Sequence, residues 1–235
     1  MVADYSGGRI REYNEAGEQL WSIEASNPFA CMGLPNGHRL VSHYSANKVV
    51  EYDADGEVYK EFTDLPSSIS GVDRTEDGHT FIAAGQGGNK VIELDPEGNK
   101  ILDLTVEGNP TSVKMLANGN LLLALYGENK IVEINREGER LHEVDIDSGP
   151  YFANQLENGN YLVACASGSK VYEYTFEGEL VWEVQGDGNL YHAQRHGDGT
   201  TTFADQSGIH HIDMNEEVVS ELDGEFGDYI YVYRF

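Results

Sequence analysis

The sequence has few residues that could form disulfides and no segment that could anchor the chain in a membrane. It contains 2 cysteines among 235 residues. Cys31 and Cys165 stand in different repeats of the pattern described below, so we expect no disulfide and a mild preference for a reducing compartment. No apolar run approaches the roughly 18 residues of a membrane span, and no signal peptide is visible. We therefore expect a soluble protein, either cytoplasmic or secreted with its leader removed.

Basic residues are also scarce. Lysine and arginine number 15 against 41 acidic residues, which gives a formal net charge of −26. Such a surface repels phosphate backbones and anionic lipid headgroups, so nucleic acid and membranes are excluded as partners. A solubilising surface explains the acidity; the alternative is attraction of cations or of a basic partner.

The common catalytic motifs are missing. The sequence has no His-Glu-x-x-His, Walker loop, Gly-x-Ser-x-Gly or paired zinc cysteines. No segment keeps a capped apolar period of 3.6 residues, so almost no helix is expected. Without a following helix, the glycine-rich run at 85–88 is interpreted as a loop and not as a phosphate cradle.

What the sequence does have is a repeat. Asn-Gly or Asp-Gly followed by a short apolar run occurs five times, with the glycines 41, 41, 40 and 40 residues apart. This spacing, with strand-like content, indicates a series of small sheets that bury their faces against each other. The five glycines are Gly37, Gly78, Gly119, Gly159 and Gly199.

A second marker lies between these glycines: a basic residue, a valine or isoleucine, one variable residue and a glutamate, as in KVVEYD at 48–53, with a degraded sixth copy from 211. Each repeat then contains four strand signals. In the fourth repeat they cover 111–116, 121–126, 130–135 and 140–144. The Asn-Gly turns are typical of hairpins, and Asp-Pro-Glu-Gly at 95–98 is typical of a type I turn.

Four antiparallel strands repeated six times predict an all-β, six-bladed β-propeller. The chain opens at 2–4 on the second strand of a repeat and closes at 229–235 on a first strand. We therefore expect the C-terminal strand to complete the N-terminal blade, which removes a long exposed edge. One monomeric domain over 1–235 is predicted, with blades at 1–26 plus 229–235, 27–66, 67–107, 108–147, 148–187 and 188–226.

Three segments carry a family resemblance: LPNGHRLV at 34–41, KVVEYD at 48–53 and GELVWE at 178–183. They resemble the propeller repeats of bacterial arylsulfotransferase-like proteins and, more loosely, NHL and PQQ-type repeats. Those sulfotransferases use a histidine as the sulfuryl acceptor. The run YHAQR at 191–195 is similar to a segment of such proteins, and only His192 and Arg195 carry over. No further histidine occupies the matching position of the other repeats.

In a propeller, the loops before the first strand and after the second strand of each blade meet at one mouth of the central channel. Residues there do not have to repeat, so departures from the consensus point to a site. We expect carboxylates, histidines and tyrosines to converge on a polar funnel with an aromatic rim. The candidate ligand-binding residues are Asp4, Tyr5, His43, Tyr44, Tyr126, Tyr151, Cys165, Tyr191, His192, Asp205 and Tyr229.

Some candidates have more specific interpretations. His192, Arg195 and His43 are the candidate catalytic residues. Asp4 and Asp205 either coordinate a hard cation with backbone carbonyls or cap loop amides. No cofactor is expected, although a cation in the central channel is possible.

The sequence favours a non-catalytic binding or scaffold propeller that recognises a small ligand or a peptide at the channel mouth. The first alternative is an arylsulfotransferase-like enzyme, or another six-bladed hydrolase or lyase, that uses the channel-mouth histidines. The second is an engineered propeller without a native ligand.

Overall fold

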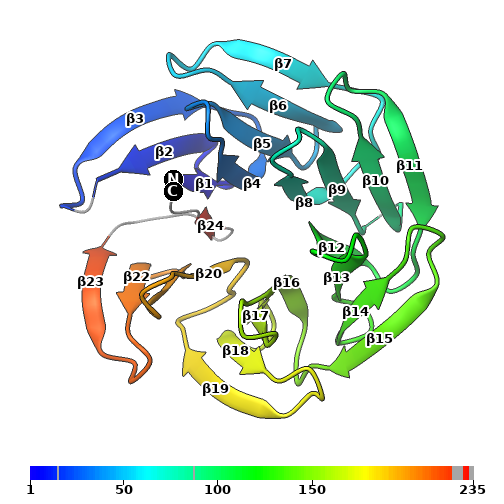
Figure 1. The fold of residues 1–235 in the computed structure, drawn as a ribbon. Helices are drawn as coiled ribbons and strands as arrows, with labels where there is room; N and C mark the ends of the chain where they lie inside the picture. Colours follow the sequence, from blue (N-terminus) through cyan, green and yellow to red (C-terminus); the bar gives the residue numbers. More distant parts are fainter. Residues whose placement is uncertain (15, 87, 224–229, 233–235) are drawn as a thin grey trace.

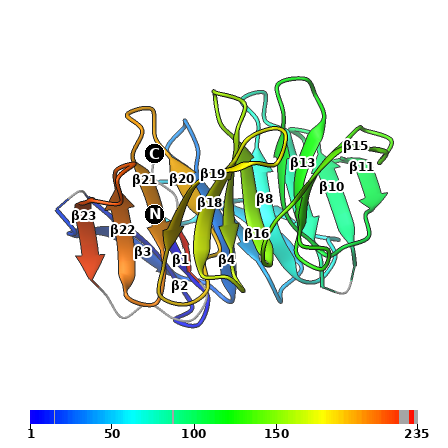
Figure 2. The same ribbon diagram turned by 90° about the horizontal axis from the view of Figure 1, so that it is seen from below.

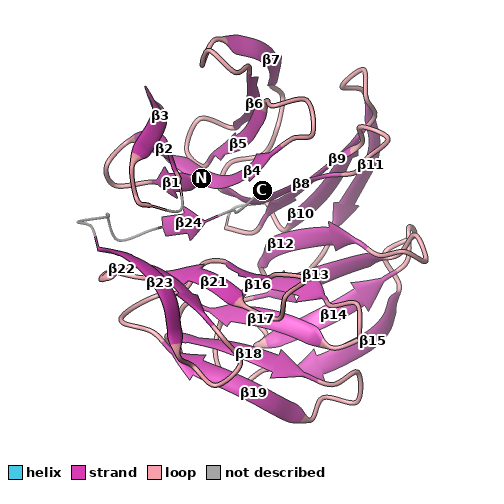
Figure 3. Ribbon diagram, turned by 60° about the vertical axis from the view of Figure 1, so that its left-hand side comes forward, coloured by secondary structure: helices cyan, strands magenta, loops and turns pink. Residues whose placement is uncertain are grey.

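The computed structural model describes residues 1–14, 16–86, 88–223 and 230–232 and confirms the predicted fold class. Six four-stranded antiparallel sheets surround a central axis (Figure 1). Seen from the side, the sheets stand as the blades of a propeller (Figure 2). Over the described residues, the secondary structure consists of strands and turns without helix (Figure 3). It follows that this part of the chain holds no helix of the length and apolarity needed to cross a membrane.

The four strands of a blade run outward from the axis, and we call these positions A to D. The A strands are β4 (Pro28–Gly33), β8 (Ile69–Arg74), β12 (Pro110–Met115), β16 (Pro150–Gln155), β20 (Ala193–Arg195) and β24 (Ile230–Val232). The B strands are β1 (Val2–Asp4), β5 (Arg39–His43), β9 (Thr80–Ala84), β13 (Leu121–Leu125), β17 (Tyr161–Cys165) and β21 (Thr201–Ala204). The C strands are β2 (Arg9–Tyr13), β6 (Lys48–Tyr52), β10 (Lys90–Leu94), β14 (Lys130–Ile134), β18 (Lys170–Tyr174) and β22 (Gly208–Ile212). The D strands are β3 (Gln19–Glu24), β7 (Val58–Phe62), β11 (Lys100–Thr105), β15 (Arg140–Asp145), β19 (Leu180–Gln185) and β23 (Val218–Asp223).

Blade 1 has the strand order β24-β1-β2-β3, and blades 2 to 6 take the remaining strands in sequence order. Strand β24 pairs antiparallel with β1, so that Val2 is opposite Val232 and Asp4 is opposite Ile230. Of the strand expected at 229–235, positions 229 and 233–235 lie outside the described residues.

The core lies between neighbouring blades. The B strand β13 is buried along its whole length, whereas four of the six residues of the D strand β15 are exposed. One apolar cluster combines Phe81 and Val91 of blade 3 with Leu123 and Val132 of blade 4. A single twisted sheet cannot cover both of its faces, so each blade depends on its neighbours for burial.

The A–B turns show why the repeat requires glycine. In blade 4, the N–H of Gly119 donates to the carbonyl of Leu116 at 2.9 Å, and φ at Gly119 is 86°. This left-handed conformation is open to glycine without steric cost. The turn therefore fixes the spacing at which the apolar B strand begins.

The repeated glutamate of the C strands is a buried connector. In blades 2 to 5 its carboxylate accepts a hydrogen bond from the residue after the turn glycine, at 2.6–2.8 Å. In blades 1, 2, 3 and 5 it also pairs with an arginine of the next blade. The motif thus joins its own hairpin turn to the neighbouring blade. The five glutamates are Glu12, Glu51, Glu93, Glu133 and Glu173.

Candidate functional site

A pocket of about 360 Å³ lies at one mouth of the ring. Aromatic rings and uncharged polar side chains form its lining. The lining residues are Tyr5, Phe29, Tyr44, Gln86, Asn109, Tyr126, Tyr151, Ala166, Ser167, Asn189 and Tyr191.

The lining residues come from the two sets of loops that the sequence analysis singled out. Tyr5, Tyr44 and Tyr126 directly follow the B strands β1, β5 and β13. Phe29 and Tyr151 occupy the second positions of the A strands β4 and β16. Six side chains remote in sequence, Tyr191 included, are therefore brought together because each blade presents the same strand ends to the axis.

Phe29 forms the floor of this pocket. Its ring lies 6.0 Å from Tyr5, 5.4 Å from Tyr44, 5.6 Å from Tyr151 and 5.7 Å from Tyr191, centroid to centroid. Only 4% of Phe29 is exposed. These contacts connect blades 1, 2, 5 and 6 through one side chain.

Tyr5 and Tyr191 stand steeply on this floor, at 75° and 77° to the Phe29 ring, whereas Tyr44 and Tyr151 are tilted against it by 34° and 36°. The ring planes of Tyr5 and Tyr44 meet at 90°, and those of Tyr151 and Tyr191 meet at 89° with centroids 4.8 Å apart. Tyr126 meets Tyr151 at 70°. Such edge-to-face contacts are a favourable arrangement of aromatic quadrupoles, and they hold neighbouring ring faces in different directions.

Neutral partners occupy the tyrosine hydroxyls at the rim. Tyr44 donates to Gln86 Oε1 at 3.1 Å, and the Tyr126 hydroxyl lies 2.8 Å from Ser167 Oγ. Asn189 Nδ2 donates to the Tyr191 hydroxyl at 2.9 Å. Among the described residues, the lining contains no Asp, Glu, His, Lys or Arg. The pocket is thus equipped for binding through ring faces and amides, and it has no strong acid or base.

Of the predicted site residues, Tyr5, Tyr44, Tyr126, Tyr151 and Tyr191 line the pocket. Asp4, His43, Cys165, His192 and Asp205 are buried outside its lining, and Tyr229 lies outside the described residues. For Asp4, His43 and Cys165, which end B strands, the reason is the pleat. Successive residues of a strand point to opposite sides, so the residue that ends a B strand turns into the protein where the next one faces the mouth.

His43 is part of the protein interior. Its Nδ1 lies 2.8 Å from the carbonyl of Ser26, and the Tyr52 hydroxyl lies 3.1 Å from its Nε2. Burial lowers the pKa of His43. A neutral ring that donates from Nδ1 to the carbonyl and accepts the tyrosine hydroxyl at Nε2 satisfies both contacts.

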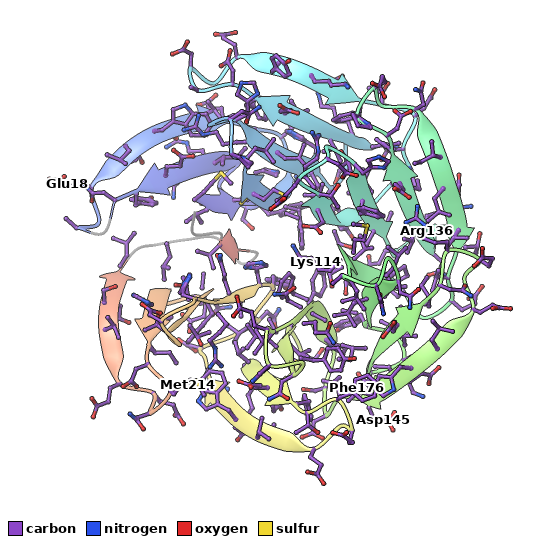
Figure 4. The ribbon with its side chains drawn as sticks, viewed as in Figure 1. Glu18, Lys114, Arg136, Asp145, Phe176 and Met214 are labelled. Atoms are coloured by element: carbon purple, nitrogen blue, oxygen red, sulfur yellow. The ribbon has the colours of Figure 1, made fainter. Side chains whose placement is uncertain are left out.

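His192 is 3% exposed and packs against Phe152, with ring centroids 4.1 Å apart and ring planes tilted by 57°. Burial, followed by the positive charge of Lys114, holds its pKa well below the usual value. Lys114 Nζ in turn donates to Asp73 Oδ1 at 2.6 Å and lies towards the centre of the ring (Figure 4). His192 is therefore a neutral, enclosed ring in this structure.

Arg195 belongs to the connections between blades. Its Nη2 lies 3.1 Å from Glu173 Oε2 of blade 5, and its guanidinium lies 4.8 Å above the Trp182 ring. His192 and Arg195 are only three residues apart in the sequence, but neither lines the pocket, and their side chains make different contacts.

Asp4 and Asp205 both accept loop N–H groups. Asp4 Oδ1 accepts from Gly7 at 2.7 Å, and Arg11 lies 3.5 Å from Asp4 Oδ2. Asp205 Oδ2 accepts from the Asp187 N–H at 2.8 Å. Over the part of the chain that the structure describes, no group of three or more His, Cys, Asp or Glu residues is placed to hold a metal ion.

Sequence reasoning missed the role of His210, which joins three parts of blade 6. Its Nε2 lies 2.8 Å from Asp205 Oδ1 and its Nδ1 lies 2.9 Å from Glu221 Oε1. Ser207 Oγ lies 3.1 Å from the same Nε2, but it also lies 2.7 Å from Asp205 Oδ1. Both ring nitrogens of His210 face carboxylates, so in its protonated form the ring donates to Asp205 and to Glu221 and the resulting ion pair anchors the B–C loop.

Gln86, Ser167 and Asn189 are pocket residues that the sequence analysis did not identify. All three stand in loops where composition alone indicates only a turn. Their one signal is position: each belongs to a B–C or D–A loop, and those loops meet at the pocket.

The structural comparisons agree on the fold. A Bacteroides caccae protein of unknown function is 17% identical with a TM-score of 0.83, over 98% of this chain and 96% of that one. A streptogramin B lyase is 15% identical with a TM-score of 0.70, over 95% and 78%. A catalytically inactive Staphylococcus aureus virginiamycin B lyase with quinupristin is 17% identical with a TM-score of 0.69, over 93% and 78%.

At the sequence level, no curated protein matches the chain. One family model does match, over residues 6–218, and it therefore spans most of the propeller. The chain belongs to this family, PQQ_2, which is described as outer membrane protein assembly factor BamB.

Proposed function

We propose that the chain is a non-catalytic binding propeller that holds a small ligand, or a side chain of a peptide, in the tyrosine pocket. The observation that carries this proposal is the pocket itself: about 360 Å³, floored by Phe29 and walled by five tyrosines from different blades. Its volume lies at the lower end of the roughly 300–1,000 Å³ that is typical of small-molecule sites.

Two comparisons support a binding role. The family description refers to a protein assembly factor, and assembly depends on recognition and not on turnover. A propeller of similar fold has been solved with quinupristin, so this architecture is compatible with ligand binding. Neither comparison names a ligand for this chain.

An arylsulfotransferase, hydrolase or lyase activity finds less support. His43 and His192 are 2% and 3% exposed and lie outside the pocket lining. A general base or a sulfuryl acceptor has to come within hydrogen-bond reach of its substrate. No feature of the structure favours the alternative of an engineered propeller without a native ligand, and we do not propose it.

The proposal is tested by calorimetry with a panel of small cations, neutral polyols and short peptides, on the wild type and on Tyr151→Ala. We expect at least one ligand to bind and its affinity to fall about tenfold or more in Tyr151→Ala, since buried aromatic anchors dominate binding energy. The control is Tyr59→Ala, because Tyr59 is 64% exposed on the outer strand β7.

Equal binding to the wild type and Tyr151→Ala, or no binding of any panel member, would contradict the proposal. Turnover of aryl sulfates or lactones that disappears in His192→Ala would favour the enzyme instead.

A further inference from the structure

We propose that the tyrosine pocket recognises a quaternary, fully methylated ammonium group. This inference rests on the binding role proposed above and names the chemical class of the ligand. It is carried by three observations: the angles between the rings, the uncharged lining and the negative charge of the whole chain.

The angles between the rings select the shape of the ligand. Tyr5 against Tyr44 and Tyr151 against Tyr191 are close to perpendicular, and Phe29 meets Tyr191 at 77°. A flat sugar or heterocycle binds best on one broad face or between parallel faces. The Phe29 ring meets Tyr5 and Tyr191 steeply, at 75° and 77°, and meets Tyr44 and Tyr151 at 34° and 36°. Ring faces in such different orientations form a concave aromatic surface, which fits a rounded group such as trimethylammonium. Aromatic cages of this kind are the known solution for quaternary ammonium recognition.

The lining selects among cations. A primary ammonium needs acceptors to replace the water it loses, and a carboxylate is the usual one. The described lining residues offer no carboxylate, only the neutral oxygens of amide and hydroxyl groups, which compensate a primary ammonium less well. A methylated ammonium has no N–H to satisfy, so its positive charge can rest directly on the ring faces.

The rim keeps those faces in place. Gln86, Ser167 and Asn189 each hydrogen-bond one tyrosine hydroxyl. The hydroxyls of Tyr44, Tyr126 and Tyr191 are thereby occupied from the protein side. A ligand consequently meets ring faces that are already oriented, which reduces the ordering cost of binding.

The overall charge supplies the last argument. The formal net charge is −26, yet the pocket itself contains no carboxylate among its described lining residues. The long-range field therefore attracts cations, while the local chemistry accepts only those that are weakly hydrated. This combination discriminates a quaternary ammonium from both a metal ion and a lysine-like amine.

The test compares choline with 3,3-dimethyl-1-butanol. In this alcohol a carbon atom replaces the charged nitrogen of choline, so the shape is kept and the charge is removed. We expect choline to bind at least tenfold more tightly than the alcohol and more tightly than ethanolamine. Tyr151→Ala is expected to lose choline binding, Tyr151→Phe to retain it within a few-fold because the ring face remains, and Tyr59→Ala to match the wild type. Raising the salt concentration should weaken the binding of choline and leave that of the alcohol nearly unchanged.

Equal affinities for choline and dimethylbutanol, tighter binding of ethanolamine, or choline binding that survives Tyr151→Ala would each overturn the inference. If choline fails to bind while another panel ligand binds through Tyr151, only the inference fails and the binding role stands. If no panel ligand binds, both fail.

Discussion

The guanidinium of Arg39 on β5 donates two hydrogen bonds to the carboxylate of Glu12 on β2, from Nε at 2.6 Å and from Nη2 at 2.7 Å. The two residues belong to neighbouring blades, and their side chains are 11% and 9% exposed. The Arg39 guanidinium also lies 4.5 Å above the ring of Trp21. This bidentate pair therefore fixes blade 2 against blade 1 in both distance and orientation.

Replacing Arg39 by alanine should destabilise the propeller by about 3–5 kcal/mol, because Glu12 would remain buried without its partner. Urea denaturation followed by fluorescence gives the free energy of unfolding. The control is Lys48→Ala. Lys48 pairs with Glu61, and the two side chains are 31% and 38% exposed. Such exposed pairs contribute about 1 kcal/mol or less to the free energy of unfolding.

The double variant Glu12→Leu with Arg39→Met sharpens the test. It removes both charges and should recover much of the lost stability, since an apolar pair of similar size often replaces a buried ion pair without loss. A double variant as unstable as Arg39→Ala would show that the loss arises from packing on Trp21 and not from the unpaired carboxylate.

The connector glutamate of blade 4 is expected to stabilise the A–B hairpin. Glu133 Oε1 accepts from Asn120 at 2.6 Å and from Asn118 at 2.9 Å, and Glu133 is 9% exposed. Glu133→Ala should lower the free energy of unfolding by about 1.5–3 kcal/mol, the range for hydrogen bonds to charged groups. Glu143→Ala on the outer strand is the control and should cost about 1 kcal/mol or less; equal losses would refute a special role for Glu133.

The ion pair of His210 should make stability depend on pH. Burial alone would lower the pKa of His210, but the bonds and charges of Asp205 and Glu221 outweigh it and raise the pKa above its ordinary value. The resulting stabilisation is complete below the unfolded pKa of about 6.5 and disappears as the pH rises through the folded pKa. Burial alone would raise the pKa of Asp205, but hydrogen bonds from His210 and from loop donors outweigh burial and lower that pKa. The stabilisation that the Asp205 carboxylate contributes is therefore lost only in acid.

We therefore expect the stability difference between wild type and His210→Gln to be largest between about pH 4 and 6.5 and to shrink above that range. Urea denaturation at a series of pH values measures it. NMR titration of the His210 ring should give a lower pKa in Glu221→Gln than in the wild type. A stability difference that is constant from pH 5 to 9 would exclude the ion pair as its source.

Both thiols should be unreactive in the folded protein. Cys31 and Cys165 are free and buried, and burial raises the pKa of Cys31 to about 12 and raises that of Cys165 as well. Because only the thiolate is nucleophilic, a disulfide-exchange reagent at pH 8 should label neither residue until denaturant is added. Labelling of one thiol within minutes under native conditions would contradict this and would show local opening of its blade.

Much of the fold follows from short-range signals. The turn glycines require a left-handed backbone, and the B strands that follow them are mainly apolar, entirely so in Leu121–Leu125. Both signals act within a single repeat, and so they are legible in one sequence without any knowledge of the neighbouring blades.

The site was only partly predictable because it depends on contacts between blades. Tyr5 and Tyr44 could be assigned to the mouth from their places after the B strands, but Asp4 and His43, one residue earlier, point elsewhere. Which of two adjacent side chains faces the axis depends on the pleat and on the twist of each strand. The central position of Phe29 depends on blades that are more than a hundred residues apart in sequence.

Phe29 also ties the pocket to the number of blades. Its ring contacts side chains from blades 1, 2, 5 and 6, and these stand on both sides of the axis only while the circle keeps its present circumference. Duplicating a repeat would widen the circle and pull the aromatic walls away from their floor, and deleting one would crowd them. A lineage that gained or lost a blade would therefore have to evolve a new binding pocket, whereas substitutions in the outer strands would leave the present pocket intact.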